Sequence, residues 1–343
     1  MNPYIGHDSQ LYGVEEHRLV GGKGDGMRIL EVANGKGMEL AITPDRAGDI
    51  ARLRFRGINM SYLSPCGYVA PAYYDSTGSN WLKSFTAGFL TTCGLQAVGS
   101  PCTDEGEELP LHGSIANQPC EQVCWREEDG LLVLHMLVKD EVIFGRKLRL
   151  EREIRVSTLE NSFEIHDVIR NTGDRVEPVE ILYHMNMGYP LLDEDSRIRI
   201  PSADVEPRDG HAAEDIENWM HMEKPAAGYQ ERCYYHKFSG REGQASIYQP
   251  KLNMGLAISF DAEEASALYQ VTSSVPPHMI LHGTNDHTVP MEQSVAYYEK
   301  LVEQGVRADL IEIERAQHGD DLFCQNQVKD KVIAFMRGIA GSW

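Results

Sequence analysis

Short stretches that alternate apolar and polar side chains dominate most of the chain. Residues 147–156 (KLRLEREIRV) and 163–170 (FEIHDVIR) alternate over their whole length, and a period of two is typical of half-buried antiparallel strands. The connecting sequence STLENS predicts a hairpin loop between them. Further segments of β-branched or alternating character lie at 38–43, 50–55, 131–138 and 177–183. No convincing helical period precedes residue 265, so the pattern predicts a large antiparallel β-sandwich.

The pattern changes after about residue 270. Residues 276–283 (PPHMILHG) predict a buried strand that enters a loop, and residues 291–305 carry apolar side chains at helical spacing and end on glycine. A short strand at 309–313 and an amphipathic helix at 328–339 follow. This succession of strand, helix, strand and helix is typical of an α/β fold and differs from the sandwich before it.

Length and composition agree with two unequal parts. The 343 residues are 42% hydrophobic and 24% charged, the mixture of a globular protein with a large core. We therefore expect a mainly β protein: an antiparallel sandwich domain over residues 1–268, followed by a short C-terminal α/β segment over residues 269–343. The segment is too short to be a complete α/β domain.

The net charge of the chain excludes some classes of binding partner. The chain has 32 basic and 52 acidic residues, a formal net charge of −20. Such a surface repels phosphate backbones and anionic lipids, so nucleic acid and membrane surfaces are not expected partners. The first ten residues lack the basic and apolar regions of a signal peptide, and no apolar run reaches the roughly 18–20 residues of a spanning helix. The seven cysteines contain no CxxC pair, which favours reduced thiols and a cytoplasmic protein.

Two segments carry the candidate chemistry. Each places a histidine beside glycine, asparagine or tyrosine at a predicted strand end: His112 in LHG and His184 in YHMNMGYP. An imidazole with an unperturbed pKa near 6.5 donates or accepts protons near neutral pH, which suits sugar hydroxyls and ring oxygens. The alternative is that His184 is a core histidine bonded to backbone. The aromatic side chains that could form an apolar wall for a saccharide are Trp81, Phe85, Tyr183 and Tyr189.

The combination of motifs resembles the aldose 1-epimerase-like (galactose mutarotase-like) superfamily, and specifically its branch known as domain of unknown function 4432. The resemblance covers about residues 1–262. The motifs that carry it are PDRAGDI (44–50), FLTTCGL (89–95), LHG (111–113), YHMNMGYP (183–190) and YQPKLNMGLAISF (248–260). The resemblance implies an antiparallel β-supersandwich, which agrees with the strand pattern.

The chemistry that this resemblance implies is the interconversion of the anomers of a free monosaccharide or a derivative. A base removes the proton of the anomeric hydroxyl while an acid protonates the ring oxygen, and the ring opens and recloses. The resemblance implies that His184 is the acid and His112 a second catalytic contact to the sugar. The substrate-binding residues it implies are Trp81, Phe85, Asn186 and Tyr189. It implies no metal, nucleotide or redox cofactor.

The sequence departs from this family at two places. The branch usually has arginine after the HG pair, where this chain has Ser114. The family's general base is a glutamate in a late strand, and no matching segment follows Phe260. The substitutes by residue type are Glu263, Glu264, Glu312 and Glu314. A sugar-binding protein without catalysis is therefore an alternative function.

The last quarter of the chain resembles a different family. PPHMILHGTNDHTVP (276–290) and IEIERAQHGD (311–320) are similar to the C-terminal end of an α/β-hydrolase of the esterase and prolyl-peptidase kind. The resemblance implies that Asp286 and His318 are the acid and histidine of a triad. The chain has no G-x-S-x-G nucleophile sequence. A serine-type esterase is thus the alternative enzyme, and the other readings of the segment are a remnant of gene fusion, a docked appendage or a contact for homo-oligomers.

Overall fold

The computed structural model divides the chain into two compact units. Unit 1 comprises Met1–Arg197, Met222–Lys224 and Ile247–Gly255, and unit 2 comprises Ile198–His221, Pro225–Ser246 and Leu256–Trp343. The residues that the structure describes are 3–104, 106–262, 278–286, 291–303, 308–317 and 321–340. The protein is mainly β, as the sequence predicts.

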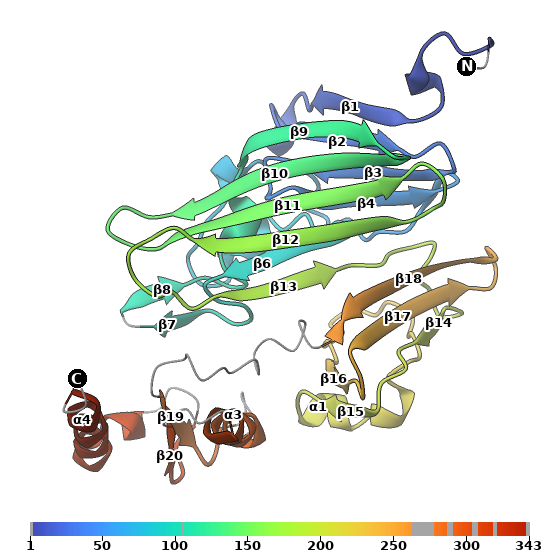
Figure 1. Ribbon diagram of the computed structural model, residues 1–343. Coiled ribbons are helices and arrows are strands. Elements are labelled where there is room, and N and C mark those ends of the chain that lie inside the picture. The colour runs from blue at the N-terminus through green and yellow to red at the C-terminus, as the bar shows by residue number, and fades with distance from the viewer. Residues whose placement is uncertain are drawn as a thin grey trace. The chain divides into compact units, whose positions relative to one another are not determined.

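Unit 1 contains a seven-stranded antiparallel sheet in the order β1-β2-β3-β4-β6-β13, with β5 paired to β4 (Figure 1). Its strands are β1 (Gly13–Arg18), β2 (Arg28–Ala33), β3 (Met38–Thr43), β4 (Asp49–Phe55), β5 (Ile58–Asn59), β6 (Leu90–Leu95) and β13 (Glu180–Met185). Strand β6 joins segments that are far apart in the chain, because it pairs with β4 on one side and with β13 on the other.

A four-stranded antiparallel sheet in the order β12-β11-β10-β9 forms the second layer of unit 1 (Figure 1). Its strands are β9 (Cys120–Glu128), β10 (Leu131–Glu141), β11 (Lys147–Ser157) and β12 (Phe163–Asn171). The alternation predicted for β11 appears as burial: Leu148, Leu150, Arg152 and Ile154 are buried, while Arg149, Glu151 and Glu153 are half-buried. The core of unit 1 lies between these two sheets.

The remaining elements are short. Unit 1 also has the hairpin of β7 (Cys102–Asp104) and β8 (Glu107–Leu109) and the 3-10 helices η1 (Asp8–Gln10), η2 (Gly22–Gly24), η3 (Pro71–Tyr73), η4 (Asn80–Lys83) and η5 (Ile115–Asn117). Two smaller sheets contain β14 (Arg197–Arg199), β17 (Glu242–Gln249) and β18 (Met254–Asp261), and β15 (Asp204–Pro207) with β16 (Tyr234–Lys237). Helices α1 (Gly210–Ala213) and η6 (Ile216–Asn218) follow β15 in sequence.

The C-terminal segment has the predicted order of elements. Strand β19 (His278–Gly283) pairs in parallel with β20 (Ala308–Ile313), and helix α3 (Met291–Glu303) connects them in sequence. Helices η8 (Asp321–Cys324) and α4 (Asn326–Ala340) follow. The predicted boundary at residue 268 lies outside the described residues and stays a prediction. No helix in the described ranges is both long and apolar enough to cross a membrane.

A fully buried arginine joins the two sheets of unit 1. The Arg152 guanidinium on β11 donates to Asp167 Oδ1 and Oδ2 at 2.9 and 2.7 Å and to Asp49 Oδ1 at 3.1 Å. It also donates to Thr92 Oγ1 at 2.8 Å and to the Ala47 carbonyl at 3.2 Å. All five of its N–H groups face acceptors, so the cation is satisfied although its side chain has no exposure to water.

The network contains two carboxylates for one guanidinium, and burial makes the Asp49 carboxyl hard to ionise. Arg152 makes its two shorter ion-pair contacts to Asp167. Burial raises the pKa of Asp49 to about 6, although Arg152 and hydrogen bonds from the Thr92 backbone and hydroxyl act against that rise. The Asp49 carboxylate is therefore buried at neutral pH at a cost that its partners offset only in part.

We predict that Asp49 makes unit 1 more stable in mild acid. Its folded pKa of about 6 lies above its ordinary value of 3.8, so its contribution to the free energy of unfolding is complete below pH 3.8 and is lost as the pH rises through 6. Between pH 7 and pH 5 the free energy of unfolding of the wild type should rise by about 1 kcal/mol relative to Asp49→Asn. Urea unfolding across this range measures the difference.

The exposed Asp174 provides the matched control, since a hydrogen bond from its own backbone N–H and the nearby Lys147 charge lower its pKa below the usual value, and it does not titrate in this range. The free energy of unfolding of Asp174→Asn should therefore change with pH in parallel with that of the wild type from pH 5 to pH 7. If the free energy of unfolding of Asp49→Asn also changed with pH in parallel with that of the wild type, the Asp49 carboxyl would have an ordinary pKa in the folded chain.

Candidate functional site

The strand register places His184 on the outer face of the seven-stranded sheet. His184 on β13 lies opposite Thr91 on β6, and Tyr183 lies opposite Thr92. Directly opposite residues share a face, and successive residues alternate between faces. The Tyr183 hydroxyl donates to Asp167 at 2.9 Å, on the side of the four-stranded sheet. His184 and Thr91 therefore face away from the core between the sheets.

Four of the predicted site residues form a closed cluster of rings on this face. Trp81 and Phe85 have ring centroids 4.3 Å apart, and Trp81 and His112 are 5.4 Å apart. His184 lies 5.8 Å from Phe85 and 5.6 Å from His112. Each ring thus contacts two others at the distances typical of packed aromatic side chains. The structure brings together the two predicted histidines and two predicted aromatic residues from three separate segments.

Hydrogen bonds fix the orientation and the tautomer of His112. Its backbone N–H donates to the Gly99 carbonyl at 2.9 Å, and the Gly99 N–H donates to His112 Nδ1 at 3.1 Å. A ring nitrogen that accepts a hydrogen bond carries no proton, so the network assigns the proton of the neutral ring to Nε2. His112 is held as an Nε2–H donor, and protonation of Nδ1 would break the bond from Gly99.

Close backbone packing explains the glycine that follows His112. Gly113 has φ +72°, and a Cβ atom there would lie 2.2 Å from the Gly94 carbonyl oxygen. The Gly94 N–H donates to the His112 carbonyl at 3.0 Å, and the Ser114 N–H donates to the Gly94 carbonyl at 3.0 Å. The HG pair is thereby fastened to strand β6, beside the strand that carries His184.

The indole of Trp81 adds an unsatisfied hydrogen-bond donor to the ring cluster. Trp81 is 2% exposed, and its Nε1–H has no hydrogen-bond acceptor among the described residues. The Thr86 hydroxyl nearby in sequence is also buried without a partner in that part of the chain. A buried polar group left without a partner costs about 1–3 kcal/mol. Such a donor suits an oxygen-rich ligand.

A second arginine, which the sequence motifs do not indicate, reaches the HG loop. Arg146 Nη2 lies 3.4 Å from the hydroxyl of Ser114. Ser114 occupies the position after the HG pair where the DUF4432 branch usually has arginine. Arg146 Nη1 donates to Glu107 at 2.7 Å, and its Nε lies 3.1 Å from Asp140 Oδ2. These residues line a cavity of about 320 Å³ together with Gly113. A guanidinium is therefore present beside Ser114 in space, although it is absent at that position in sequence.

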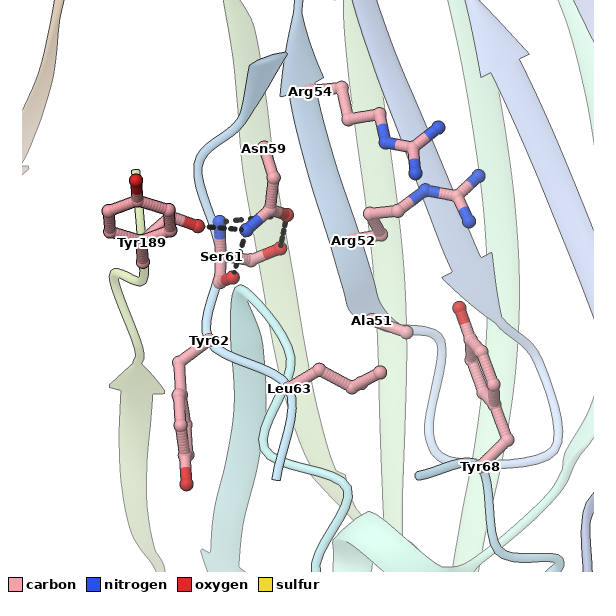
Figure 2. A pocket seen from close by; sticks show the side chains of 9 residues that line it. All are labelled: Ala51, Arg52, Arg54, Asn59, Ser61, Tyr62, Leu63, Tyr68 and Tyr189. Carbon is pink, nitrogen blue, oxygen red and sulfur yellow. Dashed lines mark hydrogen bonds between the residues drawn. The ribbon is translucent and has the colours of Figure 1, made fainter. Parts of the chain in front are cut away.

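Asn186 and Tyr189 do not join the ring cluster. The Asn186 amide nitrogen donates to the Gly88 and His184 carbonyls, both at 3.1 Å, so it holds the backbone at the end of β13. Tyr189 is 76% exposed, and its carbonyl accepts a hydrogen bond from Asn59 at 2.8 Å. Its side chain lines a different cavity (Figure 2). The predicted contact of these two residues with a substrate stays a prediction.

The hydrolase-like residues of the C-terminal segment are described only in part. Asp286 follows β19, and its Oδ2 lies 3.9 Å from His282 Nε2. His282 Nδ1 lies 2.7 Å from the Ser294 hydroxyl on α3. His318 lies outside the described residues, so its predicted pairing with Asp286 stays a prediction, as does the esterase activity.

The geometry of the described residues does not identify the general base. Among the four glutamates that match by residue type, Glu263 and Glu264 lie outside the described residues. Glu312 and Glu314 are exposed residues of unit 2. They stay candidates by residue type.

Two family models match the chain. Residues 24–273 match the model described as domain of unknown function (DUF4432), and residues 253–341 match the prolyl oligopeptidase family. These matches confirm both resemblances that the motifs predict. A search of curated proteins found no match.

Solved structures match the β fold. A provisionally assigned aldose 1-epimerase from Klebsiella pneumoniae is 26% identical, with a TM-score of 0.69 over 75% of this chain and 71% of its own. A protein from Synechocystis sp. PCC 6803 is 14% identical, with a TM-score of 0.44 over 68% and 80% of the two chains. A galactose 1-epimerase from Lactobacillus acidophilus is 14% identical, with a TM-score of 0.41 over 72% and 77%.

We predict that Gly113→Ala destabilises unit 1 and displaces the His112 loop, because the added Cβ meets the Gly94 carbonyl. Gly57→Ala is the matched control: Gly57 has φ +77° and nothing within 4 Å of an added Cβ. The control should lose about 1 kcal/mol through its left-handed backbone, and Gly113→Ala should lose at least about 2 kcal/mol. Urea unfolding compares them, and equal losses would show that the close approach adds nothing.

Proposed function

The chain belongs to the family described as domain of unknown function (DUF4432), and from this membership we propose that unit 1 binds a free aldose and interconverts its anomers. The observation that carries the proposal is the ring cluster, in which two histidine rings lie 5.6 Å apart beside a buried indole N–H. The similarity to the provisionally assigned aldose 1-epimerase, at 26% identity and a TM-score of 0.69, supports the same reaction.

His184 is the acid in this proposal. It protonates the ring oxygen, the bond between the anomeric carbon and that oxygen breaks, and the anomeric hydroxyl loses its proton to a base to give the open-chain aldehyde. Reclosure on the other face of the carbonyl returns both protons and forms the other anomer. One positioned acid contributes about 10²–10⁴-fold to such a proton transfer.

His112 and Trp81 bind and orient the sugar. The Gly99 N–H occupies His112 Nδ1, so the neutral ring offers an Nε2–H donor to a sugar oxygen. The Trp81 indole offers a second donor together with an apolar ring face. Phe85, 4.3 Å from Trp81 and 5.8 Å from His184, completes the wall. The small carbohydrate partner and the cytoplasmic location, which the net charge and reduced thiols favour, are parts of the same proposal.

We expect wild-type protein to accelerate the exchange between α and β anomers of an aldose, measured by NMR exchange spectroscopy. His184→Ala should lose at least about 10²-fold of that acceleration because the acid is removed. His166→Ala is the matched control, since His166 lies on β12 with its ring exposed and bonded to Glu164; it should keep the wild-type rate.

The outcomes separate the proposed enzyme from its alternatives. If wild-type protein neither accelerates the exchange of any common aldose nor binds one, the proposal is wrong. A rise in melting temperature with saccharide, without faster exchange, would instead identify a sugar-binding protein that lacks catalysis.

A further inference from the structure

The cavity beside Arg146 lies in unit 1 where strand β10 leads into β11 (Figure 1). Its volume is about 320 Å³, and the residues that follow β6, the β7–β8 hairpin, the HG loop and the end of β10 all contribute to its lining. The polar lining residues on which the inference depends are Tyr74, Gln96, Glu107, Gln118, Asp140 and Arg146.

This cavity is separate from the ring cluster. Asp140 occupies the buried phase of β10 together with Met136 and Val138, so its side chain points to the core side of the four-stranded sheet. His184 lies on the outer face of the other sheet, and none of the four clustered rings lines the cavity. A ligand in the cavity would therefore be additional to a sugar at His184.

Asp140 is a buried carboxylate with unused acceptor capacity. Its side chain is 3% exposed, and Arg146 Nε lies 3.1 Å from its Oδ2. Neither of these two atoms has a hydrogen-bond partner among the described residues, because the contact does not have the geometry of a hydrogen bond. A buried carboxylate is stable when several donors face its lone pairs. Asp140 therefore lacks donors that a ligand can supply.

The Arg146 guanidinium is not free to hold an anion. Its Nη1 donates to Glu107 at 2.7 Å, and its Nε lies against Asp140. A phosphate or carboxylate would have to displace one of these two carboxylates. An ammonium group at Asp140 would lie against the same guanidinium, and like charges repel at this distance. The ligand that fits is therefore an uncharged donor, such as a hydroxyl.

Two amides and a phenol provide further polar contacts. Gln96 and Gln118 are half-buried, and within the described residues their side-chain amides have no hydrogen-bond partner. The Tyr74 hydroxyl lies 3.4 Å from the Gly113 carbonyl. Burial and the charge of Asp140 raise the pKa of Tyr74 to about 12, so the phenol stays neutral. Amide and hydroxyl groups both donate and accept hydrogen bonds, which matches a ligand with several hydroxyls.

We propose that this cavity binds a neutral polyol, such as one saccharide unit, with a hydroxyl of the ligand donating to Asp140. Gln96, Gln118 and Tyr74 contact other hydroxyls of the same ligand. The site goes beyond the proposed function, because it uses no residue of the ring cluster and needs no anomeric carbon.

Polyols that cannot change anomer test the inference. Methyl α-glucopyranoside has no free anomeric hydroxyl, and myo-inositol has no anomeric carbon. We expect isothermal titration to show binding of at least one of them to the wild-type chain. Asp140→Asn should weaken that polyol at least about ten-fold, because it removes a charged acceptor. At low ionic strength myo-inositol 1-phosphate should bind no more tightly than myo-inositol, since the cavity offers no free cation.

Gln118→Ala provides a second variant if Asp140→Asn unfolds the chain, since the Gln118 amide has no partner to lose among the described residues. It should weaken the polyol about three-fold or more through the lost hydrogen bond. Gln122→Ala is the matched control, because Gln122 is an exposed residue of β9 outside the cavity. It should keep the wild-type affinity within about two-fold.

Four results would overturn the inference: no binding of either neutral polyol, unchanged affinity in the folded cavity variants, equal losses in Gln118→Ala and Gln122→Ala, or tighter binding of the phosphorylated inositol. His184→Ala should keep the wild-type affinity within about two-fold, and a loss there without a loss in Asp140→Asn would place the polyol at the ring cluster instead. Failure of the proposed function is a separate result, because it concerns the rate of anomer exchange.

Discussion

The buried ion-pair network of Arg152 is the constraint on which the rest of unit 1 depends. A guanidinium with no exposure to water is stable only when all its donors face acceptors, and here they come from the β12 carboxylate of Asp167, from Asp49, from Thr92 and from a backbone carbonyl. These acceptors lie in both sheets. The network therefore fixes how the four-stranded sheet is placed against β4 and β6, beyond what apolar packing would specify.

The outward direction of the candidate site follows from that placement. Thr92 faces Arg152, and Tyr183 donates to Asp167. Because successive residues of a strand point to opposite faces, the neighbours Thr91 and His184 have to lie on the outer face. A one-residue slip between β6 and β13 would bring His184 to the core side of the sheet. The same buried charges that fix the sheets thus also fix the face on which the two histidines meet.

The sequence predicted the strands well because their alternation is a local property. Residues 147–156 and 163–170 alternate throughout and form β11 and β12. One signal in that pattern identifies the central ion pair: Arg152 occupies the phase of Leu148, Leu150 and Ile154, the buried face. An arginine in a buried phase has to find acceptors. Its partners were not predictable, since Asp49 is 103 residues away and no local rule joins them.

Part of the candidate site was equally predictable and part was not. The motifs around His112 and His184 identified both histidines, but the sequence could not say that Asn186 uses its amide nitrogen on backbone carbonyls. Arg146 was missed because its proximity to Ser114 arises from a contact 32 residues apart. The alternation of Arg52 and Arg54 along β4 is visible in sequence, whereas the ion pair of Arg52 with Glu31 and the position of Glu39 opposite Arg54 depend on the strand register.

Net charge and local charge also lead to different conclusions about partners. The formal charge of −20 disfavours extended polyanions, because such ligands experience the field of the whole surface. A small anion in a partly covered cavity experiences mainly the charges within one screening length, about 8–10 Å at ordinary ionic strength. At β4 those charges include the guanidinium groups of Arg52 and Arg54, the Glu31 carboxylate that pairs with Arg52, and Glu39, which lies opposite Arg54 in the strand register. The net charge of the chain therefore does not decide the local charge of a cavity, which depends on how the basic and acidic side chains of neighbouring strands lie opposite one another.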